Sequence, residues 1–263
     1  MVPGIALRAQ RNAPPDVNGV MKLAFIPILV LLSSLAAAAD VQPVELHHEL
    51  VLPTGSGDKV VALTLDACGG GFDADLIGFL IEHRIQATIF ATRRWIRRNP
   101  DAIAILRAHA DLFDIENHGA NHVPAIIGSD RQVYGLAGVA DLKQLRREVS
   151  GGADAVKAAI GIAPHWYRGA TGEYDPDALK AIEAMGYKVA GFSLNADSGA
   201  TLSQKQIVAR LKKVRSGDIL IAHLNKPESD TGKGLAQALP LLVDRGFRFV
   251  TLRDAQVAPA GGR

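Results

Sequence analysis

The sequence contains a single cysteine, Cys68, in 263 residues. One cysteine excludes an intrachain disulfide framework and a structural zinc site built from several cysteines. The chain also lacks an excess of charge of one sign, with 29 Lys and Arg against 27 Asp and Glu, which excludes a strongly basic nucleic-acid binder. It lacks the composition of a disordered chain, because 48% of its residues are hydrophobic and 21% are charged. We therefore expect a folded protein with no nucleic-acid partner.

One uncharged apolar run stands near the N-terminus, at residues 23–39. It follows Lys22, ends in alanines, and is shorter than the ~20 apolar residues that a membrane-spanning helix needs. This pattern predicts a signal peptide over residues 1–39, cleaved after Ala39, with Met21 as an alternative start to Met1. A secreted or periplasmic protein with no stable membrane span follows, and an uncleaved N-terminal anchor is the alternative. Without these residues the chain is formally neutral.

From residue 59 onward, short β-branched runs alternate with helical patterns. Helices are predicted at Asp75–Arg84, after Asn99, after Asp175, at Ser203–Val214, at Leu235–Arg245, and over Leu136–Ala159 with a break at Gly151-Gly152. The seven predicted strands are Val60–Asp66, Ala87–Thr92, Leu112–Asn117, Trp166–Arg168, Lys188–Leu194, Asp218–Leu224 and Arg248–Leu252. Runs that are apolar on both faces are typical of buried parallel strands. The alternation predicts an α/β fold, and seven strands with crossover helices suit a barrel better than an open sheet, although periodicity alone does not choose between them.

Polar residues stand where several of these strands end. Asp66 ends the first strand, His118 and His122 follow the third, Arg168 ends the fourth, Asn195 and Asp197 follow the fifth, and His223 lies at the end of the sixth. Because the carboxyl ends of parallel strands form the ligand-binding face of such folds, we expect these side chains to converge.

Each of these residues has a chemical and a structural interpretation. His118 and His122 are four apart, so that on a helical turn they would face one way and could bind one divalent metal, or they are incidental. Asp66 is a general base, a metal ligand or a turn residue. His223 is a general acid or a core histidine. Arg168 holds Asp66 through a bidentate pair or forms a structural salt bridge.

Two further features have weaker links to catalysis. Cys68 is followed by three glycines, and it is either a nucleophile or a small buried apolar residue. Four arginines surround Trp95, and this basic cluster is either a solvated helix face or a contact for an anionic glycan.

The ordered set Thr64-Leu65-Asp66, Asn117-His118-x3-His122, Arg168-x3-Gly172 and Leu220-Ile-Ala-His223 resembles the polysaccharide deacetylase family, the NodB-homology domain of carbohydrate esterase family 4. The resemblance runs from about residue 59 to residue 254. It implies a distorted (β/α)7 barrel in a single domain, a divalent metal that is usually zinc, and removal of acetyl groups from a glycan. The glycan would be an N-acetylated aminosugar polymer, with peptidoglycan as one candidate. Residues 40–58 are then a leader segment packed on the surface, and residues 255–263 a flexible tail.

The resemblance also implies roles for single residues. His118 and His122 would bind the metal, Asp66 would be the base that accepts a proton from metal-activated water, and Arg168 would orient that base. His223 would be the general acid, and the backbone N–H of Thr171 would help to hold the oxyanion.

This sequence departs from the family at one metal ligand. The family's second aspartate is replaced by Ala67, so the third ligand is left to water, Asp66, Asp73 or a neighbour. Cys68 is next to the missing ligand, and whether it compensates for Ala67 is open. Two alternatives to a deacetylase therefore remain: a non-catalytic glycan-binding relative that has lost the metal, and a hydrolase of a small amide on the same scaffold.

Overall fold

The computed structural model describes residues 42–53, 55 and 57–261, which belong to one compact unit, Val41–Arg263. The predicted signal peptide lies outside the described residues. The strands are β1 Val44–Glu45, β2 His48–Leu50, β3 Val60–Ala67, β4 Ala87–Ala91, β5 Phe113–Asn117, β6 Pro124–Ala125, β7 Gln132–Val133, β8 Leu136–Ala137, β9 Trp166–Tyr167, β10 Ala170–Tyr174, β11 Lys188–Val189, β12 Leu194–Asn195, β13 Ile219–His223, β14 Arg248–Val250 and β15 Val257–Pro259. The helices are α1 Ala74–Glu82, α2 Arg93–Arg98, α3 Pro100–Ala108, α4 Leu142–Ile160, α5 Pro176–Ala184, α6 Gln204–Leu211 and α7 Thr231–Asp244.

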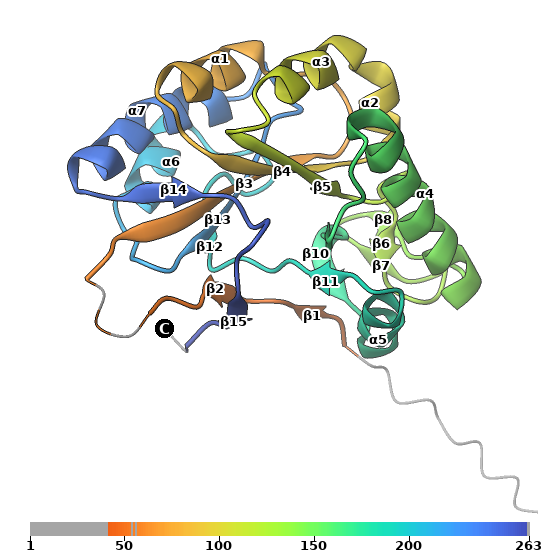
Figure 1. The fold of residues 1–263 in the computed structure, drawn as a ribbon. Helices are drawn as coiled ribbons and strands as arrows, with labels where there is room; N and C mark the ends of the chain where they lie inside the picture. Colours follow the sequence, from red (N-terminus) through yellow and green to blue (C-terminus); the bar gives the residue numbers. More distant parts are fainter. Residues whose placement is uncertain (1–41, 54, 56, 262–263) are drawn as a thin grey trace, which may run out of the picture. The chain divides into compact units, whose positions relative to one another are not determined.

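The main sheet is parallel and curled, in the order β11-β9-β5-β4-β3-β13-β12, with β14 added to the start of β3 (Figure 1). Its register aligns the carboxyl ends of the central strands: His223 of β13 lies opposite Asp66 of β3, and Asn117 of β5 lies opposite Ala91 of β4. The polar residues that follow these strands therefore meet at one edge of the sheet. The predicted α/β fold and its curled parallel sheet are confirmed.

The predicted strand Lys188–Leu194 is divided in the structure. Its first part is β11, which pairs with β9 at one end of the sheet, and the chain then crosses to β12, which pairs with β13 at the other end. Between them, the N–H of Ala190 donates to Tyr167 O and that of Ser193 donates to Ile219 O. This segment therefore links both edges of the sheet, which is how the seven predicted strands make a distorted barrel.

Alternate side chains of β3 point to opposite faces of the sheet, and each face packs in a different apolar cluster. Leu63, Leu65 and Ala67 pack with α1, α3, α6 and α7 on the outer face, where these helices are seen in Figure 1. Val60 and Ala62 pack on the inner face against residues of β4, β9 and β13. Thr64 and Asp66 continue along that inner face toward the site.

The helix predicted over Leu136–Ala159 is present as α4, but its predicted start and its predicted break are both wrong. Leu136 belongs to β8, which forms a two-stranded hairpin with β7, and α4 begins at Leu142 and continues through Gly151 and Gly152 without a break. Gly152 is required by packing: a Cβ there would lie 2.7 Å from the Cα of Gly119 and would also collide with Asn117 Oδ1. The two glycines therefore let α4 approach the loop that follows β5.

The segments that flank the barrel form strands. β1 pairs with β10, and β2 pairs with β15, so residues 257–259 of the predicted flexible tail form a strand. Leu46 and Phe192 lie side by side, since Phe192 N donates to Leu46 O at 3.1 Å. No helix in the described part of the chain is long and apolar enough to cross a membrane.

Candidate active site

Asp66 and Arg168 form the buried base of the site. Arg168 Nη1 donates to Asp66 Oδ1 at 2.9 Å and to Thr64 Oγ1 at 2.8 Å, so the structure brings together the expected pair, but through Nη1 alone and not in the bidentate form predicted. Arg168 is fully buried, and its Nε and Nη2 donate to the carbonyls of Ala190 and Gly191. Burial alone would raise the pKa of Asp66, but the charge of Arg168 and nearby imidazoles lowers it below its usual value. Asp66 is therefore ionised at neutral pH.

His118 and His122 lie close together, but on a loop and not on the expected helical turn. Gly119 and His122 have φ of +84° and +64°, which a right-handed helix does not allow. The ring centroids are 4.9 Å apart and nearly perpendicular. His118 Nδ1 lies 2.7 Å from Arg168 O, and because a carbonyl only accepts, this nitrogen carries the proton. Burial would lower the pKa of His118, but the charges of Asp66 and Cys68 raise it, so a metal would bind Nε2 in place of that nitrogen's proton.

The loop owes its shape to two residues to which sequence analysis assigned no role, Asn117 and Glu148. Asn117 Oδ1 accepts from Gly119 N at 2.8 Å. Glu148, on α4, accepts from the backbone N–H groups of Asn121 and Val123 at 2.7 and 3.2 Å. The signal was present in the sequence, because Glu148 is a charged residue on the apolar, core-facing stripe of its helix.

His223 is held by Asp197, one of the strand-end residues expected to converge, for which no chemical role was predicted. His223 Nδ1 lies 3.0 Å from Asp197 Oδ1, and Asp197 Oδ2 also accepts from His223 N at 2.8 Å and from Thr231 Oγ1 at 2.9 Å. Burial would lower the pKa of His223, but the hydrogen bonds and charges of Asp197 and Cys68 raise it well above its ordinary value. His223 is therefore an imidazolium at neutral pH, with Nε2–H available to donate.

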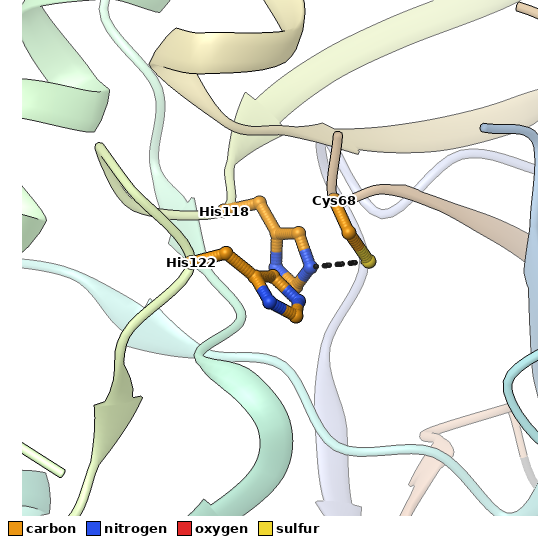
Figure 2. A group of neighbouring side chains, drawn as sticks. All are labelled: Cys68, His118 and His122. Atoms are coloured by element: carbon orange, nitrogen blue, oxygen red, sulfur yellow. Dashed lines mark hydrogen bonds between the residues drawn. The ribbon is translucent and has the colours of Figure 1, made fainter. Parts of the chain in front are cut away.

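Cys68 completes a group of side chains that could hold a metal ion. The donor atoms of Cys68, His118 and His122 all lie within 4.8 Å of one another, and Cys68 Sγ is 3.4 Å from His118 Nε2 (Figure 2). Burial would raise the pKa of this thiol, but the charge and hydrogen bond of His118 lower it well below its ordinary value. The interpretation of Cys68 as a buried apolar residue is wrong, because the side chain is half-buried and reaches the site. Two imidazoles and a thiol are donors that a divalent metal such as zinc accepts, so the residues fit.

The other proposed third ligands are less well placed. Asp73 caps the N-terminus of α1, with its Oδ1 accepting from Leu76 N at 2.9 Å. Ala67 is buried in the outer apolar cluster. Asp66 Oδ2 is 3.7 Å from His118 Nε2, but Oδ1 of the same carboxylate is bound by Arg168.

Two arginines of the predicted basic cluster support the site loops. Arg94 Nε donates to Cys68 O at 2.8 Å, and Arg93 Nη2 donates to Asn121 Oδ1 at 3.1 Å. Neither contact follows from the helical pattern of the cluster, because both partners are distant in sequence.

A cavity of about 680 Å³ opens above these groups. Asp66, Cys68, His122 and His223 line it, together with Thr171, whose φ is +73°. Tyr134, on the β7–β8 hairpin, also lines it and is 77% exposed. Cavities of this size bind small molecules or a few linked units of a polymer.

The protein is an α/β barrel. Its strand ends bring together a carboxylate, a histidine and a group of possible metal donors, an arrangement typical of a hydrolase. A model of the family described as polysaccharide deacetylase matches residues 54–190, just over half of the chain. The chain belongs to the polysaccharide deacetylase family, a family of metal-dependent hydrolases. The predicted family and the assignment as a deacetylase-type hydrolase are thus confirmed.

Three known proteins illustrate what this chain is similar to. A peptidoglycan-N-acetylglucosamine deacetylase of Bacillus cereus is 24% identical over 204 residues, covering 76% of this chain and 89% of that protein. A family 4 acetyl xylan esterase from Clostridium thermocellum, in complex with a cobalt ion, has a TM-score of 0.61 at 23% identity, covering 74% of this chain and 89% of that one. A family 4 pseudoenzyme from Bacillus anthracis has a TM-score of 0.61 at 18% identity, covering 75% and 65%. The two structures show the same fold.

Proposed function

We propose that this protein removes acetyl groups from a glycan, with Asp66 as general base and His223 as general acid. The observation that carries the proposal is that a carboxylate bound by a buried arginine and a histidine bound by a buried aspartate line the same cavity. Asp66 is held ionised by Arg168 and His223 is held protonated by Asp197, and both side chains line the same cavity. A base that is ready to accept a proton and an acid that is ready to donate one are what hydrolysis of an acetyl group requires.

In this proposal His118 and His122 hold a divalent metal. Bound there, the metal would supply Lewis-acid polarisation of the acetyl carbonyl and of water. Asp66 Oδ2, which Arg168 does not bind, accepts the proton of the attacking water. His223 Nε2 then donates a proton to the leaving amine or alcohol, while Asp197 stabilises the imidazolium. The backbone N–H of Thr171, on the cavity wall, would help to stabilise the oxyanion.

We propose an N-acetylated aminosugar polymer, such as peptidoglycan, as the substrate class. The name of the Bacillus cereus relative supports this choice, whereas the xylan esterase shows that O-acetyl groups are also substrates in the family. The exposed Tyr134 at the cavity rim offers an apolar ring beyond the reacting groups. Such a ring suits a polymer better than a small amide.

We also propose that the protein is secreted or periplasmic, with cleavage after Ala39. The support is the run of residues 23–39 in the sequence. N-terminal sequencing of the protein recovered from its own cell envelope or medium tests this, and an N-terminus upstream of residue 23 would contradict it.

The deacetylase proposal is tested by acetate release. Wild-type protein loaded with Zn²⁺ is expected to release acetate from peptidoglycan or from oligomers of N-acetylglucosamine. Asp66→Asn and His223→Gln are each expected to lower kcat by about 10²–10⁴-fold, as expected for the loss of a general base or acid. Asp101→Asn, which changes an exposed carboxylate on α3, is the matched control and should leave kcat unchanged.

A non-catalytic glycan-binding protein is the second candidate. Ala67 at the family's carboxylate position and the pseudoenzyme among the similar structures favour it. It predicts glycan binding without acetate release, and an affinity for glycan that Asp66→Asn leaves unchanged. Metal-loaded protein that binds glycan but releases no acetate from any acetylated glycan would reject the deacetylase in favour of this candidate.

A further inference from the structure

The end of β3 presents alternate side chains to the site. Thr64 and Asp66 both reach Arg168 on the inner face, and Cys68, two residues further on, lines the cavity with Asp66. Ala67 points the other way, into the apolar cluster beneath α1 and α2, and its side chain has no exposed surface. At this strand end a donor at position 68 faces the imidazoles, whereas position 67 faces the core.

The distance between the donors fits a shared metal ion. With Zn–S near 2.3 Å and Zn–N near 2.0–2.1 Å, a sulfur and a nitrogen on one tetrahedral zinc are about 3.6 Å apart. Cys68 Sγ and His118 Nε2 are 3.4 Å apart. The donor atom of His122 lies within 4.8 Å of both.

Three neighbours keep Cys68 and His118 in this arrangement. Arg94 Nε and Thr92 Oγ1 both donate to Cys68 O, at 2.8 Å each, which holds the backbone of the cysteine. Arg168 O accepts from His118 Nδ1 and turns Nε2 toward the sulfur. The pair is therefore pre-organised by contacts that do not involve the metal.

We propose that Cys68 is the third protein ligand, so that this chain has a Cys/His/His metal site in which a thiolate replaces the carboxylate lost at Ala67. This inference rests on the proposed function, since it takes His118 and His122 as ligands. A thiolate carries the same single negative charge as a carboxylate, but it is a softer donor. The site is consequently selective for Zn²⁺ and Co²⁺ over Mn²⁺ and Mg²⁺, which prefer oxygen.

Cobalt spectroscopy tests the ligand set without any activity assay. The full-length mature protein is stripped of metal, kept reduced, and titrated with Co²⁺. Wild-type protein should develop a near-ultraviolet thiolate-to-cobalt charge-transfer band at one equivalent. Because the chain has one cysteine, such a band from monomeric protein can arise only from Cys68.

Three variants separate the possible outcomes. Cys68→Ala should abolish the band and weaken Zn²⁺ binding by more than the 10–100-fold typical of losing a supporting residue. Cys68→Asp should bind metal without the band and with improved Mn²⁺ affinity. Asp66→Asn should keep the band, because Asp66 is the base and not a ligand. Circular dichroism of each metal-free variant checks that it is folded.

The results also separate this inference from the proposed function. If His118→Ala loses metal while Cys68→Ala binds Zn²⁺ like the wild type, the cysteine ligand is rejected and the metal site stands. If His118→Ala also binds like the wild type, both are rejected. A wild-type cobalt complex without the charge-transfer band overturns the inference directly.

Discussion

Replacing Arg168 by methionine removes a buried guanidinium that joins three parts of the barrel. Arg168 lies on the chain after β9, donates to Asp66 and Thr64 on β3, and donates to Ala190 and Gly191 in the segment that crosses between the sheet edges. Methionine is of similar length and can keep the packing on Phe90, whose ring centroid is 4.3 Å from the guanidinium carbon. The substitution therefore deletes the hydrogen bonds and the charge with little change in volume.

The expected loss of stability is large. Removing one partner of a buried ion pair costs about 3–5 kcal/mol because the other charge stays buried. Leaving a buried carbonyl without a donor adds about 1–3 kcal/mol. The Arg168→Met loss of more than about 4 kcal/mol is comparable with the whole stability of many domains, which is about 5–15 kcal/mol.

A double-mutant cycle isolates the part due to the buried charge. Asp66→Asn removes the charge and leaves Arg168 an amide oxygen to bind. In Asp66→Asn with Arg168→Met the unpaired carboxylate is absent, so the double variant should be more stable than the sum of the single changes by about 2 kcal/mol or more. Urea unfolding of the metal-free proteins at pH 7, followed by circular dichroism, gives the four free energies.

Additive effects, within about 0.5 kcal/mol, would refute this reasoning. If Arg168→Met does not accumulate as folded protein, the double variant should still do so, and a double variant that is equally unfolded would also count against it. Acid unfolding gives an independent check. The pKa of Asp66 is lowered by folding, so its contribution is present above its unfolded value and is lost as the pH falls through its folded value. Arg168→Met should lose this acid-sensitive contribution.

Three further predictions concern the surroundings of the site. Gly152→Ala should destabilise the protein by about 1–3 kcal/mol and weaken Zn²⁺ binding, because the added Cβ collides with the loop that carries His118. Gly78→Ala in α1, where the added Cβ meets open space, should instead stabilise the protein by about 0.5–1 kcal/mol. Thermal unfolding measures both changes. Equal effects of the two changes would be inconsistent with the packing of α4. Asp197→Asn should lower the pKa of His223, so that kcat falls at a lower pH than in the wild type as the acid loses its proton, and an unshifted alkaline limb of the pH profile would argue against His223 as the acid. Glu116, whose pKa burial and Asp114 raise to about 8, should make the wild type lose stability as the pH rises from its unfolded value toward 8. Glu116→Gln, which has no such proton to lose, should show a flatter dependence in urea unfolding over that range.

The strands were predictable because each is a short apolar run with its own boundaries. Val60–Asp66 and Asp218–Leu224 correspond closely to β3 and β13, and the polar residue at each end lies at the same edge of the sheet. Helix starts with a proline after a capping residue, as at Pro100 and Pro176, were equally local signals. The division of Lys188–Leu194 was not predictable, because pairing with β9 and β13 depends on where those strands lie.

The loops of the site were less accessible to sequence reasoning. The spacing of His118 and His122 fits a helix, but the loop is shaped by the side chains of Asn117 and Glu148, and Glu148 comes from a distant helix. The break predicted at Gly151-Gly152 was wrong for a related reason. Glycine lowers helix propensity locally, but here the missing side chain makes room for that same loop.

By itself, the sequence determined the alternation of strands and helices, the family, and which residue types stand at the strand ends, because these are local properties of the chain. Only the tertiary structure decided how those residues combine. It paired His223 with Asp197. It also buried the side chain of Ala67 in the apolar core and placed Cys68 beside His118, although fifty positions separate these two residues in the sequence. The physical reason is that a donor set is defined by distances between atoms, and these distances are set by strand register and loop packing, not by spacing along the sequence.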